Sequence, residues 1–247
     1  MNTNKKNNVL IALVAVVAFS LVPGNIFAQT TQVVVESWDQ VLLNKFIEGG
    51  AGFMSTVLVA LILGLAFCIE RIIALSLAST NTKKLLASVS DNLESGNVDG
   101  AKEVCKANRS PIASIMHQGL QRVNDGVDAV EKAVVAYGSV EMGKLEKGLT
   151  WISLFIALAP MLGFMGTVVG MIGAFDAIQA AGDISPTVVA GGIKVALLTT
   201  VFGLVAAIIL QIFYNYIVTR IDSIVNDMEG ASIEFVDMLI HNNIVKK

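Results

Sequence analysis

The sequence predicts an all-α integral membrane protein with three long transmembrane helices and a cytoplasmic helical domain. Apolar residues make up 54% of the 247 residues and charged residues only 15%, whereas a soluble domain carries about 25% charged residues. The mean hydropathy is +0.70. Three stretches are long enough to cross a bilayer and nearly free of charge, and apolar residues elsewhere recur at helical spacing. Lipid is therefore the expected solvent for much of the chain.

Composition also excludes several classes of protein. The hydrophobicity is too high for a disordered chain, and the net charge of −3 with a pI near 5.4 disfavours a nucleic-acid-binding protein. Two cysteines, Cys68 and Cys105, are too few for a disulfide framework. His117 and His241 have no metal-ligand pattern around them, and the glycines lack the spacing of a nucleotide-binding loop. We therefore expect no enzymatic activity, no metal and no cofactor.

Residues 1–28 have the features of a signal peptide. Lys5 and Lys6 precede an apolar run over residues 9–22, and Ala28 ends a candidate cleavage site. The alternative is an uncleaved N-terminal membrane helix. If the segment is cleaved, the mature chain begins outside the cytoplasm.

The next two segments approach and enter the membrane. Residues 29–48 are expected to be a periplasmic amphipathic segment on the outer membrane boundary, with Trp38 as an interfacial anchor. Residues 49–78 are the first predicted transmembrane helix, whose first 21 residues are uncharged and can span a bilayer of about 30 Å. The apolar pattern resumes after Glu70 and Arg71, so we expect this helix to continue past the membrane surface.

Residues 79–147 change character and predict a cytoplasmic helical domain. They hold more than half of the 17 lysines and arginines. Asn97, Asp125 and Gly126 are placed to separate its helices, and Pro111 suits a first helical turn. Its first apolar residues recur at helical spacing: Leu85, Leu86, Val89 and Leu93.

Two further spans complete the predicted membrane part. Residues 148–175 are uncharged, and residues 187–219 are interrupted only by Lys194. The connection at 176–186 holds no lysine or arginine, whereas the C-terminal segment 220–247 is charged and has amphipathic spacing. The positive-inside rule therefore places the connection in the periplasm and both basic segments in the cytoplasm, which gives an N-out, C-in topology.

Small residues mark the second span. Gly163, Gly166 and Gly170 give the helix a small surface on which another helix can pack closely. Pro160 frees a backbone carbonyl, which membrane helices tolerate where protein or pore water satisfies it. A packed helix pair is enough to explain the glycines.

Three threonines are isolated among apolar residues of two spans. Thr167 lies in the second span, and Thr199 and Thr200 lie in the third. A single membrane threonine commonly bonds back to its own helix. Three of them on neighbouring spans could instead line a shared polar lumen, although a threonine does not titrate near pH 7 and so cannot store a proton.

Lys194 is the one charge placed deep in the predicted membrane zone. Burying an ammonium at the bilayer centre costs several kcal/mol, so the side chain needs a partner or an exit. One alternative is that it extends to the outer headgroups. The other is that it faces a carboxylate of another chain, because no acidic residue of this chain is expected deep in a span.

Motifs along the chain resemble a known family. They are Glu70-Arg71 at the end of the first span, the stretch 101–120, the run 159–170, and residues 192–207, which are GIKVALLTTVFGLVAA. In this order, and with the three-span charge topology, the chain resembles the ExbB/TolQ/MotA family of proton-channel stator proteins over residues 50–225. Its ExbB members are the most similar.

The resemblance implies an assembly and partners. It implies a homopentamer in the bacterial inner membrane, with the second and third spans around a pore in which Thr167 and Thr200 match the pore threonines. It also implies an ExbD-like single-span partner that carries the essential aspartate, and a TonB-like protein that transmits the work to outer-membrane receptors. Many relatives have a glutamate where this chain has Val195. The titrating group is therefore expected on the partner, and protons are the expected transported ion.

Several functions are compatible with the sequence. The main expectation is an ExbB-like subunit that uses the proton motive force to energise TonB-dependent transport. Alternatives are a TolQ-like role in envelope integrity, a gliding-type motor, and a membrane scaffold that conducts no ions. A solute carrier is disfavoured because no inverted repeat is visible.

Overall fold

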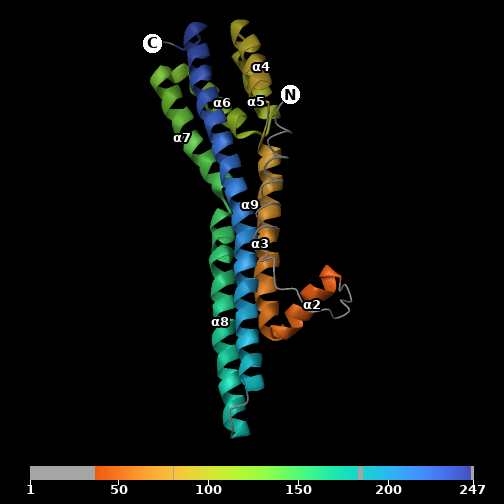
Figure 1. Ribbon diagram of the computed structural model, residues 1–247. Coiled ribbons are helices and arrows are strands. Elements are labelled where there is room, and N and C mark those ends of the chain that lie inside the picture. The colour runs from red at the N-terminus through yellow and green to blue at the C-terminus, as the bar shows by residue number, and fades with distance from the viewer. Residues whose placement is uncertain (1–36, 80, 183–185, 246–247) are drawn as a thin grey trace. The chain divides into compact units, whose positions relative to one another are not determined.

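The computed structural model describes residues 37–79, 81–182 and 186–245. The predicted signal-peptide segment, residues 1–28, lies outside them. Within these residues every regular element is a helix (Figure 1). The chain divides into two compact units, Met1–Val41 and Leu42–Lys247, and the second unit is described below by itself.

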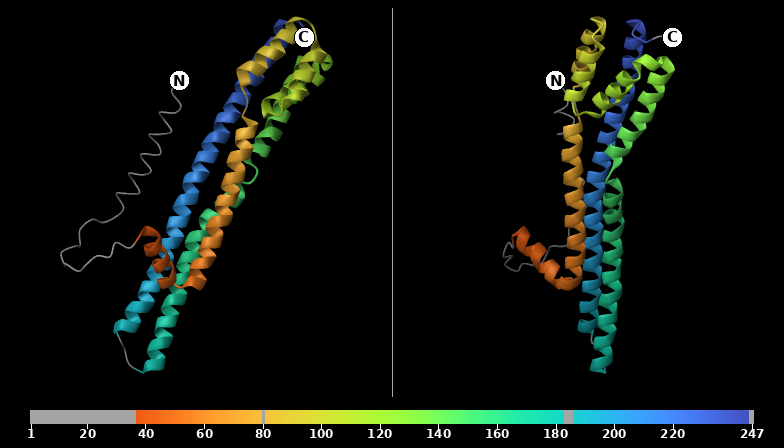
Figure 2. Two further views of the ribbon diagram at one scale, coloured as in Figure 1. Left: turned by 90° about the vertical axis from the view of Figure 1, so that its right-hand side faces the viewer. Right: turned by 180° about the vertical axis from the view of Figure 1, so that it is seen from behind.

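In the part of the chain that the structure describes, three helices are long and apolar enough to cross a membrane, which fits a multi-pass membrane protein. They are α3 (Ala51–Ala78), α8 (Leu149–Ala181) and α9 (Pro186–His241). Figures 1 and 2 show the three lying side by side, with α8 and α9 paired along most of α8 and α3 against both.

The helix bounds extend the expected spans. As expected, α3 continues through Glu70 to Ala78 as one rod. Helix α8 runs to Ala181, so Asp176, expected in the connection, is helical. The end comes where Gly182 adopts the left-handed conformation that glycine favours at helix C-termini.

The third span and the C-terminal segment form one helix rather than two. Helix α9 has 56 residues and is therefore about 84 Å long. After Pro186 no proline interrupts it. Its first part pairs with α8 and α3, and its last part joins the helical domain.

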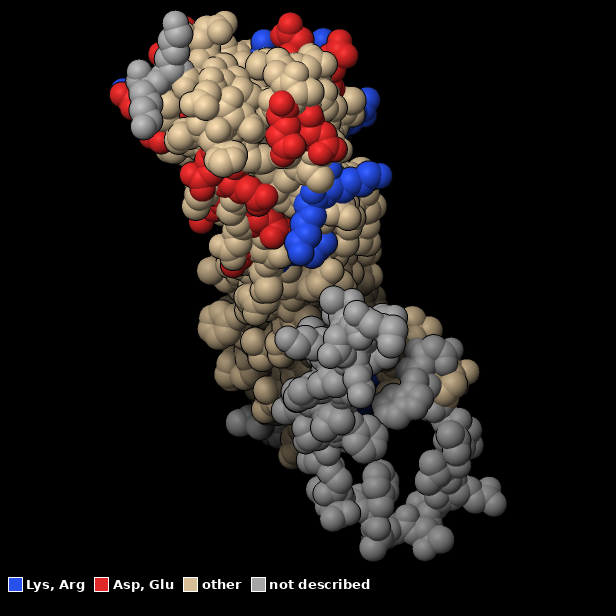
Figure 3. Space-filling model, turned by 90° about the horizontal axis from the view of Figure 1, so that it is seen from above, with Lys and Arg blue, Asp and Glu red and all other residues tan. Residues whose placement is uncertain are grey.

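The helical domain consists of short helices around the end of α9. Three of these helices have capped first turns, because the side chains of Asn81, Asn97 and Ser110 each accept a hydrogen bond from a backbone N–H three residues later. Figure 3 looks onto this end and shows charged side chains gathered over it. The helices are α4 (Thr82–Glu94), α5 (Val98–Ala107), α6 (Pro111–Gln121), the 3₁₀ turn η1 (Val123–Asp125) and α7 (Val127–Glu146).

The core of this domain forms around Phe235 of α9. Its ring is fully buried, and a Cβ placed on Gly119 of α6 would lie 2.7 Å from it. Leu93 and Val130 are also buried in this core. The α9 residues Ile224 and Met228 are buried as the amphipathic spacing predicts, whereas Ile233 is exposed. The membrane helix is thus continuous with the core of the helical domain.

Candidate functional site

The backbones of α8 and α9 touch where small residues meet. A Cβ on Gly203 would lie 2.6 Å from the carbonyl oxygen of Ala159, and a Cβ on Gly163 would lie 2.9 Å from that of Thr199. Real Cβ atoms do not come this close to a backbone oxygen, so larger residues would force the helices apart. Close approach through small residues is how helices associate in lipid.

The other α8 glycines differ in their surroundings. A Cβ on Gly166 would lie 2.7 Å from the Thr199 side chain, and one on Gly170 would lie 3.2 Å from the backbone nitrogen of Ala196. Gly173 has nothing within 4 Å of that position. The tight contact continues past Gly170, because a Cβ on Gly192 of α9 would lie 2.3 Å from the Ala174 side chain, whereas the Cβ position of Gly173 lies outside it. Helix α8 also runs without interruption through Pro160.

The three threonines occupy different positions around this contact. Thr167 Oγ1 donates to the carbonyl of Phe164 at 2.6 Å, and Thr199 Oγ1 donates to that of Ala196 at 2.8 Å. Thr199 is fully buried between the helices, whereas Thr167 and Thr200 are part-exposed. Thr200 Oγ1 lies 3.5 Å from the carbonyl of Gly163 on the facing helix.

Thr199 therefore contributes to packing, whereas Thr167 and Thr200 are accessible. Thr199 fills the contact that Gly166 leaves open. Thr167 lies four residues, or about 6 Å, beyond Gly163, whose carbonyl faces Thr200, so the two part-exposed threonines lie within about one turn of each other along the helix pair. A hydroxyl that donates to a backbone carbonyl keeps lone pairs that can accept from water.

Lys194 forms an ion pair with Glu48 of its own chain. Lys194 Nζ lies 3.0 Å from Glu48 Oε2 at the end of α2 (Trp38–Glu48), and Lys45 Nζ lies 2.7 Å from the same oxygen. This pair lies within the chain, and the alternative of a carboxylate from another chain stays a prediction. The chain turns at Gly49 and Gly50, which brings Glu48 back against α9.

The two lysines keep Glu48 ionised. Hydrogen bonds from Lys45 and then from Lys194 lower the pKa of Glu48 below its ordinary value of 4.5. The contribution of these ion pairs to the stability of the folded protein is therefore complete above pH 4.5. It is lost only as the pH falls through the lowered pKa of Glu48.

Hydrogen bonds from Arg71, near the end of α3, stabilise the bend between α7 and α8. Arg71 forms a bidentate pair with Glu70, and its Nη1 donates to the carbonyl of Lys147. Gly148, the residue between the two helices, has φ +92°, and a Cβ on it would lie 3.2 Å from Arg71 Cδ. The Glu70-Arg71 motif thus joins the first span to the start of α8.

Substituting Gly148 with alanine is expected to destabilise the protein by about 1–3 kcal/mol, because a left-handed residue with a side chain is strained and the methyl group also crowds Arg71. Thermal unfolding of the purified protein in detergent measures the loss. Gly143→Ala is the matched control, since this helical glycine has open space around it. The control should be neutral or more stable. Equal melting temperatures for both variants would contradict the strained break.

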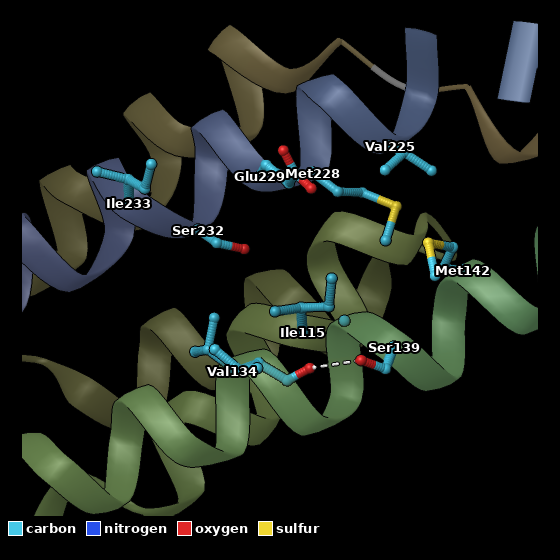
Figure 4. A pocket seen from close by; sticks show the side chains of 11 residues that line it. Ile115, Val134, Ser139, Met142, Val225, Met228, Glu229, Ser232 and Ile233 are labelled. Atoms are coloured by element: carbon cyan, nitrogen blue, oxygen red, sulfur yellow. Dashed lines mark hydrogen bonds between the residues drawn. The ribbon is translucent and has the colours of Figure 1, made fainter. Parts of the chain in front are cut away.

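A groove of about 410 Å³ lies between α6, α7 and α9 (Figure 4). Ile115, Val134 and Met228 make up much of its apolar lining, and Glu229 is its one charged side chain. At its rim, Val135 and Ile233 are each about two-thirds exposed. The groove is distant in sequence from the threonines and offers an apolar surface of the helical domain.

The remaining reactive side chains belong to the core. Cys105 is buried, and burial raises the pKa of its thiol to about 11, so it is protonated at neutral pH. Among the described residues, no three His, Cys, Asp or Glu side chains are placed to hold a metal ion.

Fold and site together define a class of protein: a multi-pass helical membrane protein whose paired spans bring threonines together and continue into a large extramembrane domain. Residues 107–230 match the sequence profile of the MotA/TolQ/ExbB proton channel family, and the chain belongs to this family. The matched residues include the whole α8–α9 contact.

Three relatives show the range of the similarity. The chain is 33% identical over 191 residues to a putative biopolymer transport protein ExbB homolog of Methanothermobacter thermautotrophicus, covering 76% of this chain and 67% of the relative. It is 31% identical over 125 residues to the Tol-Pal system protein TolQ of Haemophilus influenzae, covering 49% and 55%. It is 32% identical over 106 residues to the biopolymer transport protein ExbB of Xanthomonas campestris pv. campestris, covering 40% and 42%.

Proposed function

We propose that the chain is the ExbB-like subunit of an inner-membrane proton-channel stator that energises TonB-dependent outer-membrane transport. The observation that carries this proposal is the pair of part-exposed threonines, Thr167 and Thr200, within about one turn of each other on two tightly packed spanning helices. The proposed role is non-enzymatic and uses no cofactor, and protons are the transported ion.

The proposal assigns the titrating group to a partner. No aspartate or glutamate occurs in residues 149–175 or 186–221, so the paired spans offer hydroxyls but no carboxylate. A single-span, ExbD-like protein with a membrane aspartate would supply it. A proton that crosses the membrane releases about 2.3 kcal/mol per 100 mV. The unbroken α9 is suited to carry such work from the membrane to the helical domain.

The assembly is proposed to be a homopentamer around the partner, with a TonB-like protein as the recipient of the work. Exposed apolar side chains outside the predicted spans support self-association, since Val135 and Ile233 line the groove between α6, α7 and α9 and are each about two-thirds exposed. The proposed orientation keeps the α8–α9 connection in the periplasm and the helical domain in the cytoplasm.

Two other functions have observations in their favour. Similarity to a TolQ protein supports a stator that serves envelope integrity. The hydroxyls of Thr167 and Thr199 bond to their own helices, as they would in a scaffold that conducts no ions.

Co-purification with the products of neighbouring genes, followed by native mass spectrometry, tests the proposal. We expect five copies of this chain with a small single-span protein that has one membrane aspartate. The identity of that partner also separates the ExbB-like role from the TolQ-like role. A stable complex without such a partner, or a monomer, would contradict the proton-motor proposal and leave the scaffold.

A further inference from the structure

The end of α2 is joined to α9 by contacts that the proposed proton path does not use. Glu48 pairs with Lys194 at 3.0 Å. The rings of Phe46 and Phe202 meet edge to face, with centroids 6.0 Å apart. We call these two interactions the α2–α9 contact. They are ionic and aromatic, and they lie on the same side of α9 as the start of α3.

A tight turn fixes the position of Glu48. Gly49 N donates to the carbonyl of Lys45 at 2.9 Å, and Gly50 N donates to that of Ile47 at 3.1 Å. Gly50 has φ +83°, a conformation that favours glycine. Val195 of α9 lies 3.7 Å from the position of a Cβ on Gly50, so the turn itself borders α9.

The apolar face of α2 around Phe46 is otherwise uncovered. Leu42, Leu43 and Ile47 are each more than half exposed. An apolar helix face next to the start of a spanning helix is suited to the acyl boundary of a bilayer. With Phe46 and Glu48 on α9, α2 therefore connects α9 to the membrane surface.

Glu48 has two ammonium partners, and this makes the contact easy to release. Lys45 is on the same helix, three residues earlier, and remains beside Glu48 if Lys194 moves away. The carboxylate then keeps one partner in either state. Both Glu48 and Lys194 are partly exposed, so water can solvate the freed lysine, and exposed ion pairs are individually weak.

We propose that Glu48 is a positioning residue that latches α9 to α2 at the membrane boundary and releases it during the work cycle. Lys194 precedes Thr200 by six residues, or about 9 Å along α9, so the latch acts close to the threonine level. The proposal rests on the proposed function in one respect, namely that α9 moves when protons pass.

The test uses the purified complex with its partner in liposomes, with a spin label at Leu43→Cys in a background where both native cysteines are alanine. Glu48→Gln and Lys194→Gln should each increase label mobility, and the charge swap Glu48→Lys with Lys194→Glu should restore it. Lys45→Gln is the matched control, since it removes a cation but keeps the Glu48–Lys194 pair. Raising salt should loosen the wild type but not Glu48→Gln.

A second readout concerns the work cycle. Proton-driven uptake through an outer-membrane receptor should fall about threefold in each single variant and recover in the charge swap. Unchanged mobility in both single variants would overturn the latch. So would a swap that fails to restore either readout. Label mobility is measured without a proton gradient, so a wild-type complex that moves no protons would overturn the proposed function while the label still tests the α2–α9 contact at rest.

Discussion

Replacing Gly203 with valine is expected to separate α8 from α9 and to abolish the activity of the complex. The first atom of the new side chain would lie 2.6 Å from the carbonyl oxygen of Ala159, and a backbone atom cannot move aside as a flexible side chain can. Overpacking in a well-packed interior typically lowers the free energy of unfolding by about 1–3 kcal/mol. Because the clash here is with the backbone, we expect a loss of about 3 kcal/mol or more. Gly163→Val on the facing helix should have the same effect.

Gly173→Val is the matched control for these variants. It adds the same side chain to α8, but nothing lies within 4 Å of the new Cβ. We expect the control to assemble and function as the wild type does. Assembly is measured by native mass spectrometry and stability by thermal unfolding in detergent. Normal assembly and activity of Gly203→Val, or equal losses in Gly173→Val, would show that the close α8–α9 approach is not required.

The double variant Thr167→Val, Thr200→Val is expected to stop proton movement without preventing assembly. Valine keeps the branched shape of threonine and has a methyl group in place of the hydroxyl. Each lost hydrogen bond to water is worth about 1 kcal/mol, so two lost bonds should slow proton transfer by on the order of tenfold or more. Thr199 is left intact because its buried side chain fills the α8–α9 contact.

Thr56→Val provides the control for the loss of a membrane hydroxyl. Thr56 on α3 also donates to the carbonyl three residues earlier, at 2.7 Å, and α3 carries none of the threonines assigned to the path. Dye-reported acidification of liposomes that contain the complex measures the proton rate. Full rates in the Thr167, Thr200 variant would favour the non-conducting scaffold. An equally large loss of proton rate in Thr56→Val would show that Thr167 and Thr200 have no special role.

Local signals made most of the fold predictable. Asn81, Asn97 and Ser110 cap helices because their short polar side chains satisfy free backbone donors, and that chemistry depends on neighbouring residues only. The length and apolar composition of α3, α8 and α9 likewise follow from the sequence. The sequence did not predict that α9 continues unbroken into the helical domain, since the change from uniformly apolar to amphipathic spacing suggested two elements.

The sequence predicted the features of the candidate site that lie within one helix, but not the contacts between residues far apart in the chain. The glycines of α8 are recognisable as a small surface, but the sequence does not show that Gly173 lies outside the contact. The Glu48–Lys194 pair depends on the turn at Gly50, which brings together residues far apart in the chain. Arg71 donates to the backbone carbonyl of Lys147. Every residue has such a carbonyl, so the sequence does not indicate which one Arg71 binds.

Proton uptake by liposomes that contain the complex under an imposed membrane potential is the most direct test of the proposed function. Three preparations are compared: this chain with its partner, this chain alone, and this chain with a partner whose membrane aspartate is replaced by asparagine. The proposed division of labour predicts uptake in the first preparation only, because residues 149–175 and 186–221 offer hydroxyls and no carboxylate. Uptake by this chain alone, or no uptake by the complete complex, would contradict it.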